Sequence, residues 1–277
     1  MHPINTHTKL FGVIGHPVTH SLGPAMHNLA LSATGINGIY LAFDVTDIPS
    51  TIAAIRALSI AGISVTVPHK TTVMPYLDAI DETAAAIGAV NTITNTNNTL
   101  TGHNTDAHGA VTALEEQTGS LKNKAITILG AGGAARAVAY GTIQKGSHVL
   151  IANRSRSKGE KLAADLNARF CELSDIQSVS YDILINTTPV GMHPNTDEIP
   201  ISPDALKPGT TVMDIIYNPL QTRLLQEARK RGCETIDGVP MFIHQGARQF
   251  ALWTGREPPV DKMRELVYKE LRKPFTH

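Results

Sequence analysis

The sequence predicts an α/β protein with two domains, the first of them built on a mostly parallel sheet. Its length of 277 residues suits about two domains. Strand and helix signals alternate through the first part of the chain, as in a βαβαβ series. A second βαβ unit begins near residue 124, where an apolar strand meets a glycine-rich turn and an alanine-rich helix.

In the first domain, buried strands alternate with helices. We predict strands at 10–14, 39–43 and 63–67, and helices at 24–34 and 48–58. Pro lies near the start of the first helix and Gly35 near its end, which is the usual placing of these residues. Pro68 stops the third strand because it has no N–H to continue a ladder. Asn-rich sequence from 91 to 105 then interrupts the pattern.

A helix that begins near Asp106 and ends at Gly119 is predicted to link the two domains. Ala107, Ala110, Val111 and Leu114 give it one apolar face. The second domain then has strand candidates at 124–129, 148–152, 181–185 and 211–215. The tail from 241 to 272 has a helical pattern broken by two prolines, and we expect it to return to the first domain. The predicted domains are therefore 1–105, joined by 241–277, and 106–240.

The glycine-rich turn fits the spacing of a dinucleotide-binding fingerprint. Gly130, Gly132 and Ala135 match G-x-G-x-x-G/A between a strand and a helix. Gly130 permits the tight turn, Gly132 lets backbone N–H groups approach a pyrophosphate, and Ala135 allows close helix packing. The helix N-terminus then faces the anion. A tight strand-to-helix turn without a ligand is the alternative, and the βαβ context favours a Rossmann-type domain.

The loop after the next strand indicates which dinucleotide binds. An NAD site usually has an acidic residue there, whereas this chain has Asn153-Arg-Ser-Arg-Ser-Lys158 with no carboxylate before Glu160. Arg154 and Arg156 can pair with a 2′-phosphate through charge-assisted hydrogen bonds. A solvated basic loop is the alternative, but behind this fingerprint the loop predicts NADP.

Composition excludes several classes of protein. Lysine plus arginine number 24, as do aspartate plus glutamate, so no basic field suits a nucleic acid or a membrane surface. No apolar run is long enough to span a membrane, and the first residues do not resemble a signal peptide. Cys171 and Cys233 are far apart and predict a reducing, cytoplasmic setting rather than a disulfide framework. The spacing of the 12 histidines predicts no metal site. We expect a monomer or a homodimer.

Polar residues follow the predicted strands of the first domain, where open α/β sheets bind ligands. Ser21 precedes the first helix, and its hydroxyl is either a helix cap or a ligand for a carboxylate. Lys70 comes after the third strand and Asp106 after the Asn-rich segment. Carbonyl reduction needs a proton as negative charge develops on oxygen, and an ammonium oriented by a carboxylate can deliver it. We therefore pair Lys70 with Asp106 as a hypothesis, with a solvated lysine as the alternative.

Several blocks of this chain, in order, resemble the shikimate dehydrogenase family of NADP-linked enzymes. They begin with Gly15-His-Pro-Val-Thr-His-Ser21 and Val65-Thr-Val-Pro-His-Lys70, and continue with Gly88-Ala-Val-Asn-Thr92 and Asn104-Thr-Asp106. The later blocks are the Gly130 turn, Asn153-Arg-Ser155, Asn186-Thr-Thr-Pro-Val-Gly-Met192, Asp214-Ile-Ile-Tyr-Asn-Pro219 and Gly238-Val-Pro-Met-Phe-Ile-His-Gln245. The resemblance implies reversible reduction of 3-dehydroshikimate to shikimate, a step of aromatic amino-acid biosynthesis.

The resemblance also implies roles for individual residues. Lys70 would be the acid/base residue and Asp106 its partner on the substrate hydroxyls. The rest of the substrate pocket would be Ser21, Gly23, Thr66, Asn91, Tyr217 and Gln245. NADP would contact Gly130, Ala131, Gly132, Gly133, Ala134, Asn153, Arg154, Ser155, Arg156, Ser157 and Lys158. Glu82, Ile215, Gly238 and Met241 would surround the nicotinamide or its ribose.

Two departures from the family pattern leave the substrate open. The family usually has a second serine where this chain has Gly23, and asparagine where it has Ser64. Loss of a hydroxyl that binds a charged group costs roughly 1.5–3 kcal/mol. We therefore expect a raised KM for shikimate or a preference for a modified substrate. The alternatives are a quinate/shikimate or aminoshikimate dehydrogenase and, in a different class, a non-catalytic NADP-binding regulator.

Overall fold

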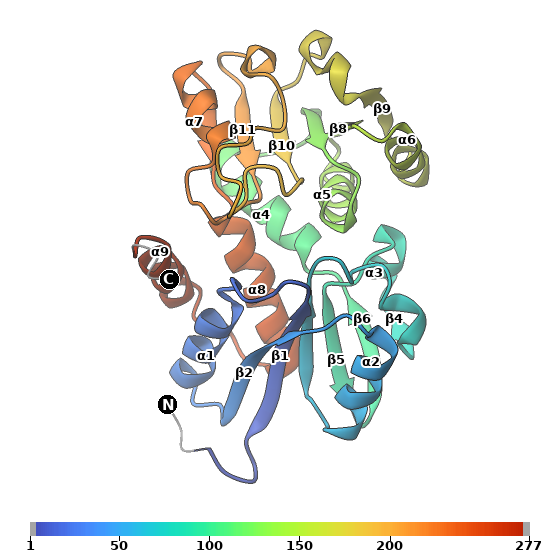
Figure 1. Cartoon of the computed structure of the whole chain (residues 1–277), viewed down its shortest axis with the longest axis vertical. Helices are drawn as coiled ribbons and strands as arrows, with labels where there is room; N and C mark the ends of the chain where they lie inside the picture. Colours follow the sequence, from blue (N-terminus) through green and yellow to red (C-terminus); the bar gives the residue numbers. More distant parts are fainter. Residues whose placement is uncertain (1–3, 274–277) are drawn as a thin grey trace. The chain divides into compact units, whose positions relative to one another are not determined.

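The computed structural model describes residues 4–273, which form two compact units. The first unit comprises residues 4–105 and 243–273, and the second comprises residues 106–242. The outermost limits of the predicted domains, residues 1 and 277, lie outside the described residues. The expected fold class, two α/β domains, is confirmed (Figure 1).

The first unit is a six-stranded sheet covered by helices. Its strand order is β2-β1-β3-β5-β6-β4. The strands are β1 (Lys9–Gly15), β2 (Gly38–Asp44), β3 (Gly62–Val65), β4 (Ala79–Ile80), β5 (Thr92–Thr96) and β6 (Thr99–His103). The helices are α1 (Gly23–Ala33), α2 (Ile48–Ala57), α3 (Glu82–Ile87), most of α8 (Val239–Thr254) and α9 (Val260–Leu271), with a short 3₁₀ helix at Met74–Tyr76.

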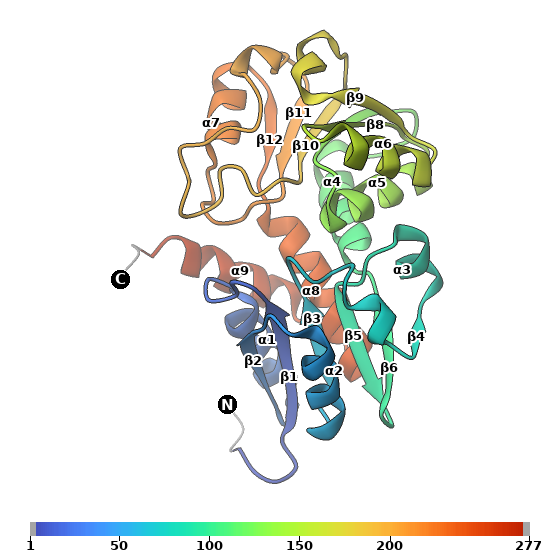
Figure 2. The ribbon, with the colours of Figure 1, turned by 45° about the vertical axis from the view of Figure 1, so that its right-hand side comes forward.

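The two faces of this sheet have different covers. Helix α2 packs on one face through Ile48, Ile52 and Ile55, in a core shared with Ile63 and Ile93. Helices α1 and α8 lie on the other face (Figure 2). The C-terminal helices thus return to the first unit, as the sequence predicts, and α9 packs against α1.

The Asn-rich segment forms a hairpin that the sequence analysis did not predict. Strands β5 and β6 are antiparallel, and β5 is antiparallel to β3, so the sheet is mixed. Thr96 pairs with Thr99, and the two residues between them, Asn97 and Asn98, have φ values of 51° and 68°. Asparagine tolerates this left-handed conformation, which a two-residue hairpin turn of type I′ requires at both positions. The Asn-Asn pair was therefore a turn signal.

The second unit has a wholly parallel six-stranded sheet in the order β12-β11-β10-β7-β8-β9. This is the doubly wound order of a Rossmann fold, whose ligands bind where the strand order reverses, here between β7 and β10. Its strands are β7 (Ala125–Leu129), β8 (His148–Asn153), β9 (Arg169–Glu172), β10 (Ile183–Asn186), β11 (Thr211–Asp214) and β12 (Glu234–Ile236). Its helices are α4 (Asp106–Thr118), α5 (Gly133–Gln144), α6 (Arg156–Asp165) and α7 (Arg223–Lys230).

Apolar residues bury both faces of this parallel sheet. Helices α4, α5 and α6 pack on one face around Ile126, Ile128 and Ile151. Helix α7 and the 3₁₀ helices at Leu173–Ser178 and Pro203–Ala205 cover the other face. Short apolar strands such as β7 and β10 are what a sheet buried on both sides requires. Within residues 4–273, no helix is both long enough and apolar enough to cross a membrane.

Candidate active site and cofactor site

Lys70 lies in a tight turn after β3, at the carboxyl end of the first unit's sheet. Its carbonyl oxygen accepts a hydrogen bond from the N–H of Val90 at 2.8 Å, which ties the turn to the residue before Asn91. Thr66, at the start of the turn, donates its N–H to Ile14 at 2.9 Å. A side chain at Gly15 would come within 2.4 Å of the Thr66 methyl group, so this close approach depends on glycine.

Asn91 is the centre of a buried hydrogen-bond network in the same unit. Its side chain is fully enclosed, and its Oδ1 accepts from the Thr105 N–H and the Thr92 hydroxyl, each at 2.8 Å. Its Nδ2 donates to the Thr105 hydroxyl at 2.9 Å and to Gln245 Oε1 at 3.4 Å. The structure therefore brings together two predicted substrate residues, Asn91 and Gln245, whose amides lie 154 residues apart in sequence.

Asp106 is the first residue of α4 and only 4% exposed. By the division of the chain it belongs to the second unit, whereas Lys70 belongs to the first. One peptide bond joins Asp106 to Thr105, whose N–H and hydroxyl are both bonded to Asn91. Its backbone is therefore anchored to the Asn91 network through Thr105.

Ser21 and Gly23 lie at the start of α1. The Ser21 hydroxyl accepts a hydrogen bond from the Gly23 N–H at 3.1 Å, so it partly serves as a local cap. A side chain at position 23 would place its Cβ 3.1 Å from Ser21 Oγ and 3.4 Å from the Tyr40 hydroxyl. The Tyr40 hydroxyl in turn donates to Ser64 Oγ at 2.7 Å. Both departures from the family pattern, Gly23 and Ser64, thus adjoin Tyr40.

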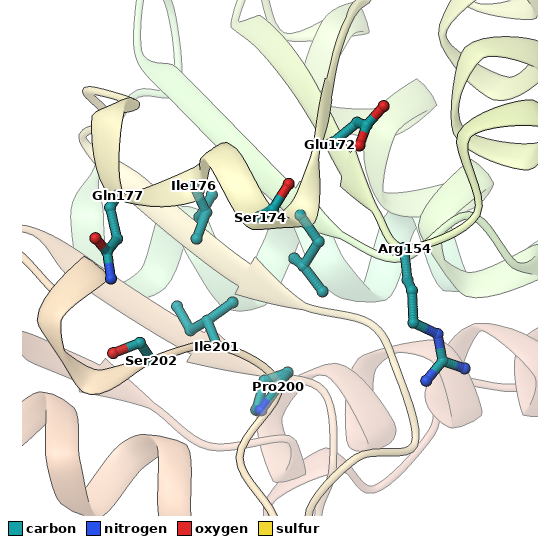
Figure 3. A pocket seen from close by; sticks show the side chains of 9 residues that line it. Arg154, Glu172, Ser174, Ile176, Gln177, Pro200, Ile201 and Ser202 are labelled. Atoms are coloured by element: carbon teal, nitrogen blue, oxygen red, sulfur yellow. The ribbon is translucent and has the colours of Figure 1, made fainter.

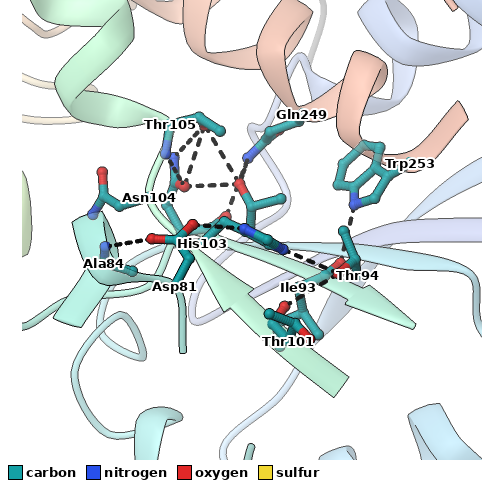
Figure 4. A network of polar contacts seen from close by, with 12 residues as sticks. Asp81, Ala84, Ile93, Thr94, Thr101, His103, Asn104, Thr105, Gln249 and Trp253 are labelled. Carbon is teal, nitrogen blue, oxygen red and sulfur yellow. Dashed lines mark hydrogen bonds and ion pairs between the residues drawn. The ribbon is translucent and has the colours of Figure 1, made fainter. Parts of the chain in front are cut away.

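Two residues of this network, Tyr40 and Gln249, were missed by the sequence analysis. Gln249 Oε1 accepts from the Ser64 hydroxyl at 2.8 Å, and its Nε2 donates to the Asn91 carbonyl at 3.1 Å and to the Thr92 hydroxyl at 3.0 Å. Figure 4 shows Gln249 and Trp253 both reaching from α8 towards the strands. Gln249 lies one helical turn beyond Gln245, and that i, i+4 spacing was the signal available in the sequence.

His27, on α1, packs against this network. Its ring stacks on Tyr40 with 4.4 Å between ring centroids, and it is also hydrogen-bonded to Gln249. Burial lowers the pKa of His27 to about 3, against a small opposing effect of Gln249. The ring is therefore neutral at physiological pH and belongs to the apolar support of Tyr40 rather than to the charged part of the site.

Glu82, predicted near the nicotinamide, begins α3 and is exposed. The preceding residue, Asp81, caps this helix by accepting from the Ala84 N–H at 2.6 Å. Its other oxygen lies 2.6 Å from Nδ1 of His103, at the end of β6. Asp81 thus links α3 to β6, the strand that precedes Asn104 (Figure 4).

In the glycine turn of the second unit, Gly130 and Gly132 have different structural roles. Gly130 has a φ of 114°, and a Cβ there would lie 2.7 Å from Thr187 Oγ1, so the fold itself requires glycine. At Gly132, no atom of the described residues lies within 4 Å of the point that a Cβ would occupy, so the fold leaves that side open. Gly133 and Ala134 then open α5, with Ala135 fully buried beneath. Open space beside Gly132 at a helix N-terminus fits a pyrophosphate.

The cations of the basic loop after β8 differ in whether they are paired with a carboxylate. Arg156 is paired with Glu160 at 2.9 Å and with Glu172 at 3.3 Å, and its pKa is raised by the Glu160 hydrogen bond first of all. Arg154 and Lys158 are both exposed and have no carboxylate partner within the described part of the chain. The cations of this loop without a carboxylate partner are therefore Arg154 and Lys158, whereas Arg156 already has two carboxylate partners.

A cavity of 380 Å³ adjoins Arg154 in the second unit. Figure 3 shows the Arg154 side chain on one side of it, with Gln177 and Ser202 on the other. Its lining mixes polar and apolar side chains: Arg154, Glu172, Leu173, Ser174, Ile176, Gln177, Pro200, Ile201 and Ser202. A planar, partly polar group such as a nucleoside base suits this lining.

The other predicted cofactor residues of this unit lie around the end of β11. A Cβ at Gly238 would lie 2.4 Å from the Ile215 carbonyl oxygen, so these two predicted residues are in close contact. Met241 is buried near the start of α8, and Tyr217 stacks on Phe242 with ring centroids 4.5 Å apart. Glycine at 238 is required because the backbone at Ile215 passes directly against it.

Asp214 is a buried carboxylate at the end of β11. The sequence analysis mentioned it only as the first residue of the Asp214–Pro219 block that resembles the family. Its Oδ1 accepts from Asn186 Nδ2 and the Ile216 N–H, each at 3.1 Å, and its Oδ2 accepts from the Thr222 hydroxyl at 2.7 Å. Burial raises its pKa to about 6, although these three hydrogen bonds oppose the effect. Asp214 therefore fixes the loop that contains Ile215 and Tyr217.

Across the described ranges of both units, no cluster of three or more histidine, cysteine or acidic residues is arranged to hold a metal ion.

Three family models match the chain. Residues 13–93 match a shikimate dehydrogenase substrate-binding domain, residues 112–193 match a shikimate/quinate 5-dehydrogenase model, and residues 238–268 match a shikimate 5′-dehydrogenase C-terminal domain.

Individual relatives agree over nearly the whole length. The shikimate dehydrogenase (NADP+) of Methanocaldococcus jannaschii is 46% identical, covering 98% of this chain and 100% of the relative. A crystal structure of a shikimate dehydrogenase in complex with NADP+ superposes with a TM-score of 0.93 at 45% identity, over 98% of both chains. A quinate dehydrogenase from Corynebacterium glutamicum in complex with NAD gives a TM-score of 0.88 at 34% identity, over 95% of this chain and 99% of that one.

Proposed function

The chain belongs to the shikimate dehydrogenase (NADP+) family, and we propose how its residues perform the reversible, NADP-dependent reduction of 3-dehydroshikimate to shikimate. The single observation that supports this proposal best is the Asn91 network, which holds a buried amide next to the Lys70 turn and includes Thr105, the residue before Asp106. Such a network positions hydroxyl and carboxylate groups of a small polyol acid.

Lys70 is the proposed acid/base residue. When bound, NADPH supplies the hydride, and the oxygen that gains negative charge needs a proton. The Lys70 ammonium delivers that proton in reduction, and its neutral amine removes it in oxidation. The carbonyl of Lys70 is held by Val90, so the side chain starts from a fixed backbone. Asp106 is its proposed partner: the Asp106 carboxylate accepts a hydrogen bond from a substrate hydroxyl and so orients the substrate.

The remaining first-unit residues bind and orient the substrate. Ser21 and Thr66 supply hydroxyls, the first for the carboxylate, and Asn91 and Gln245 supply amides. Tyr217 is a further proposed substrate residue. Because Asn91 and Gln245 are already bonded to one another, little rotamer freedom is lost when substrate binds.

The residues present fit NADP. The open side of Gly132 and the N-terminus of α5 suit a pyrophosphate. Arg154 and Lys158 suit a 2′-phosphate, since neither is paired with a carboxylate in the described structure. The cavity beside Arg154 suits the adenine, and Ile215, Gly238 and Met241 are the residues of this unit proposed for the nicotinamide end. Glu82 is a further proposed cofactor residue.

The assay that tests this function measures NADP reduction with shikimate, and compares quinate as substrate and NAD as cofactor. We expect turnover with shikimate and NADP, and weaker turnover with NAD. Absence of shikimate oxidation with either cofactor would contradict the proposal, and would leave a non-catalytic NADP-binding protein as the better description.

A second candidate, a dehydrogenase that also accepts quinate, is favoured by Gly23. Glycine at this position lacks the hydroxyl of the family's second serine, next to Ser21 and Tyr40. We expect Gly23→Ser to lower KM for shikimate by roughly 10-fold, because a hydrogen bond to a charged group is worth about 1.5–3 kcal/mol. A KM that stays the same or rises would mean that position 23 does not set affinity for the carboxylate.

We propose further that the protein works in the cytoplasm, on the ground that both cysteines, Cys171 and Cys233, are free thiols. It acts either as a monomer or as a homodimer, which sedimentation at micromolar concentration distinguishes.

A further inference from the structure

The last residues of three neighbouring strands of the second unit lie side by side. Asn186, which ends β10, pairs in register with Leu129, the end of β7, and with Asp214, the end of β11. The strand order of this sheet reverses between β7 and β10, and dinucleotides bind at such a reversal. Asn186 and Asp214 are both 0% exposed, so neither side chain forms the surface that a ligand would touch.

The hydrogen bonds of the Asn186 side chain have one possible direction. The Thr188 N–H can only donate, so the atom of the Asn186 amide that lies 3.0 Å from it is Oδ1. The Thr188 hydroxyl donates to the same oxygen at 2.7 Å. The NH₂ group therefore faces Asp214 and donates to its Oδ1 at 3.1 Å. The Asn186 side chain thus joins the loop that follows β10 to the carboxylate that ends β11.

Asp214 extends this connection to the loop after β11. Its Oδ1 also accepts from the Ile216 N–H at 3.1 Å, and its Oδ2 accepts from the Thr222 hydroxyl at 2.7 Å. Because Oδ1 already faces two donors, a proton on the carboxyl group belongs on Oδ2, where the Thr222 oxygen can accept it. The bond from Asn186 to Oδ1 is therefore kept in both protonation states of Asp214.

On its other side, Asn186 adjoins the glycine turn. The next residue, Thr187, donates its N–H and its hydroxyl to the Leu129 carbonyl, at 3.0 and 2.6 Å. A Cβ at Gly130 would lie only 2.7 Å from the Thr187 hydroxyl oxygen, so the loop after β10 is in direct contact with the turn. Through residues 186 and 187, hydrogen bonds thus connect the glycine turn to the loop after β11.

We propose that Asn186 is a positioning residue for the cofactor, which holds the loop at residues 215–217 in a fixed place relative to the glycine turn. The inference rests on the proposed function, in which the turn binds the pyrophosphate and Ile215 belongs to the nicotinamide end. NADP binds productively only when these two segments keep their spacing. The basic loop after β8 lies on the other side of β7 in the strand order, so binding of the 2′-phosphate should not depend on Asn186.

The test compares Asn186→Ala with the wild type in binding and in turnover. Adenosine 2′,5′-bisphosphate keeps the adenine and the 2′-phosphate of NADP but lacks the nicotinamide and its ribose. We expect Asn186→Ala to raise the Kd for NADP about fivefold or more, and to leave the Kd for adenosine 2′,5′-bisphosphate within about twofold of wild type. Because small misplacements of reacting groups are costly, kcat for shikimate oxidation should fall about tenfold or more.

Thr222→Val tests the same network without a change at Asn186, and decides the question if Asn186→Ala does not fold. It removes the hydroxyl that bonds to Asp214 and caps α7. The Kd for NADP should rise about threefold, and the Kd for adenosine 2′,5′-bisphosphate should not change. Thr222→Ser keeps the hydroxyl and should restore the wild-type values.

Thr142→Val is the matched control, because Thr142 is a buried threonine of the same unit whose hydroxyl donates to carbonyl groups of its own helix, α5. Both Kd values should stay as they are in this variant. A change in Thr142→Val as large as that in Thr222→Val would show that loss of any buried hydroxyl weakens NADP, and would overturn the proposed role of the network.

The remaining outcomes separate this inference from the proposed function. Equal weakening of NADP and adenosine 2′,5′-bisphosphate would mean that Asn186 supports the unit as a whole, and would overturn its role as a positioning residue. An unchanged Kd for NADP in Asn186→Ala and Thr222→Val would overturn that role as well. A wild type that does not oxidise shikimate overturns the proposed function, while the two Kd values still decide the role of Asn186.

Discussion

The proposed cofactor residues of the second unit and the proposed substrate residues of the first differ in how they relate to the fold. Arg154 and Lys158 are exposed and Gly132 borders open space, so these groups do little for the folded unit itself. Asn91 and Gln249 are 2% exposed, and their bonds join α8 to strands about 150 residues earlier in the chain. At Gly132, Arg154 and Lys158, cofactor recognition is therefore separable from folding, whereas substrate recognition at Asn91 shares its residues with a core.

The largest expected effect is that of Lys70→Ala, because this substitution removes the proposed acid/base group from a turn of the first unit. We expect kcat for shikimate oxidation to fall at least ~100-fold, since a positioned acid/base group contributes that much. The Kd for NADP and the melting temperature should stay near their wild-type values. Lys9→Ala, an exposed lysine at the start of β1, is the matched control. Wild-type turnover in Lys70→Ala would refute the assignment.

A buried group of the second unit should behave differently from its exposed cofactor residues. Because burial raises the pKa of Asp214 to about 6, the folded state favours the protonated form relative to the unfolded chain. Protonated Asp214 therefore contributes its full stabilisation below about pH 4, and this stabilisation is lost as the pH rises through 6. For a pKa shift of about two units, the loss in free energy of unfolding is about 3 kcal/mol.

Urea unfolding of the wild type and of Asp214→Asn between pH 4 and pH 7.5 checks this. We expect the wild type to lose stability relative to the variant over that range. If the difference in free energy of unfolding between the wild type and Asp214→Asn did not depend on pH, Asp214 would not be protonated in the folded protein near pH 5.

The two arginines of the basic loop sharpen the contrast within one segment. Arg154→Asp should weaken NADP binding roughly 10- to 100-fold and NAD binding much less, since only NADP has the 2′-phosphate. Arg156→Asp should weaken NADP less, because Arg156 is already paired with Glu160 and Glu172. Fluorescence titration with both nucleotides measures this. Equal weakening of NADP and NAD by Arg154→Asp would indicate a structural role.

The smallest expected effect separates the two glycines of the turn. Gly132→Ala should leave the melting temperature unchanged and weaken NADP several-fold, because its added methyl group meets only the ligand. Gly130→Ala should destabilise the protein, since φ is 114° and Thr187 blocks the Cβ. If Gly132→Ala bound NADP as well as the wild type, the pyrophosphate would not lie on that side of the turn.

The sequence predicted most of the second unit because its signals are local. The fingerprint, the basic loop and the strands β7, β8, β10 and β11 each lie within one short stretch of chain. The short edge strands β9 and β12 were not predicted, since their sequences, Arg-Phe-Cys-Glu and Glu-Thr-Ile, lack the apolar run of a strand such as β10. The pairing of Arg156 with Glu172 was also not predictable, because it depends on β8 and β9 being neighbours.

In the first unit the sequence identified single residues but not how they are connected. Gln245 was identified only through a resemblance, and Tyr40 and Gln249 not at all. A buried tyrosine on a strand looks like a core residue, and its hydroxyl acquires a role only when Ser64 is placed beside it. The β5–β6 hairpin was read as an interruption because alternating Thr and Asn residues hid its strand pattern.

Trp253 gives the first unit a built-in optical reporter. It is the only tryptophan of the 277 residues, and its indole N–H donates to the Ile93 carbonyl at 3.0 Å while its ring closes over Gly62. Selectively excited indole emission therefore originates in the first unit alone, whereas far-ultraviolet circular dichroism sums over both. Unfolding curves from the two signals will coincide if the units melt together and separate if the nucleotide-binding unit melts independently.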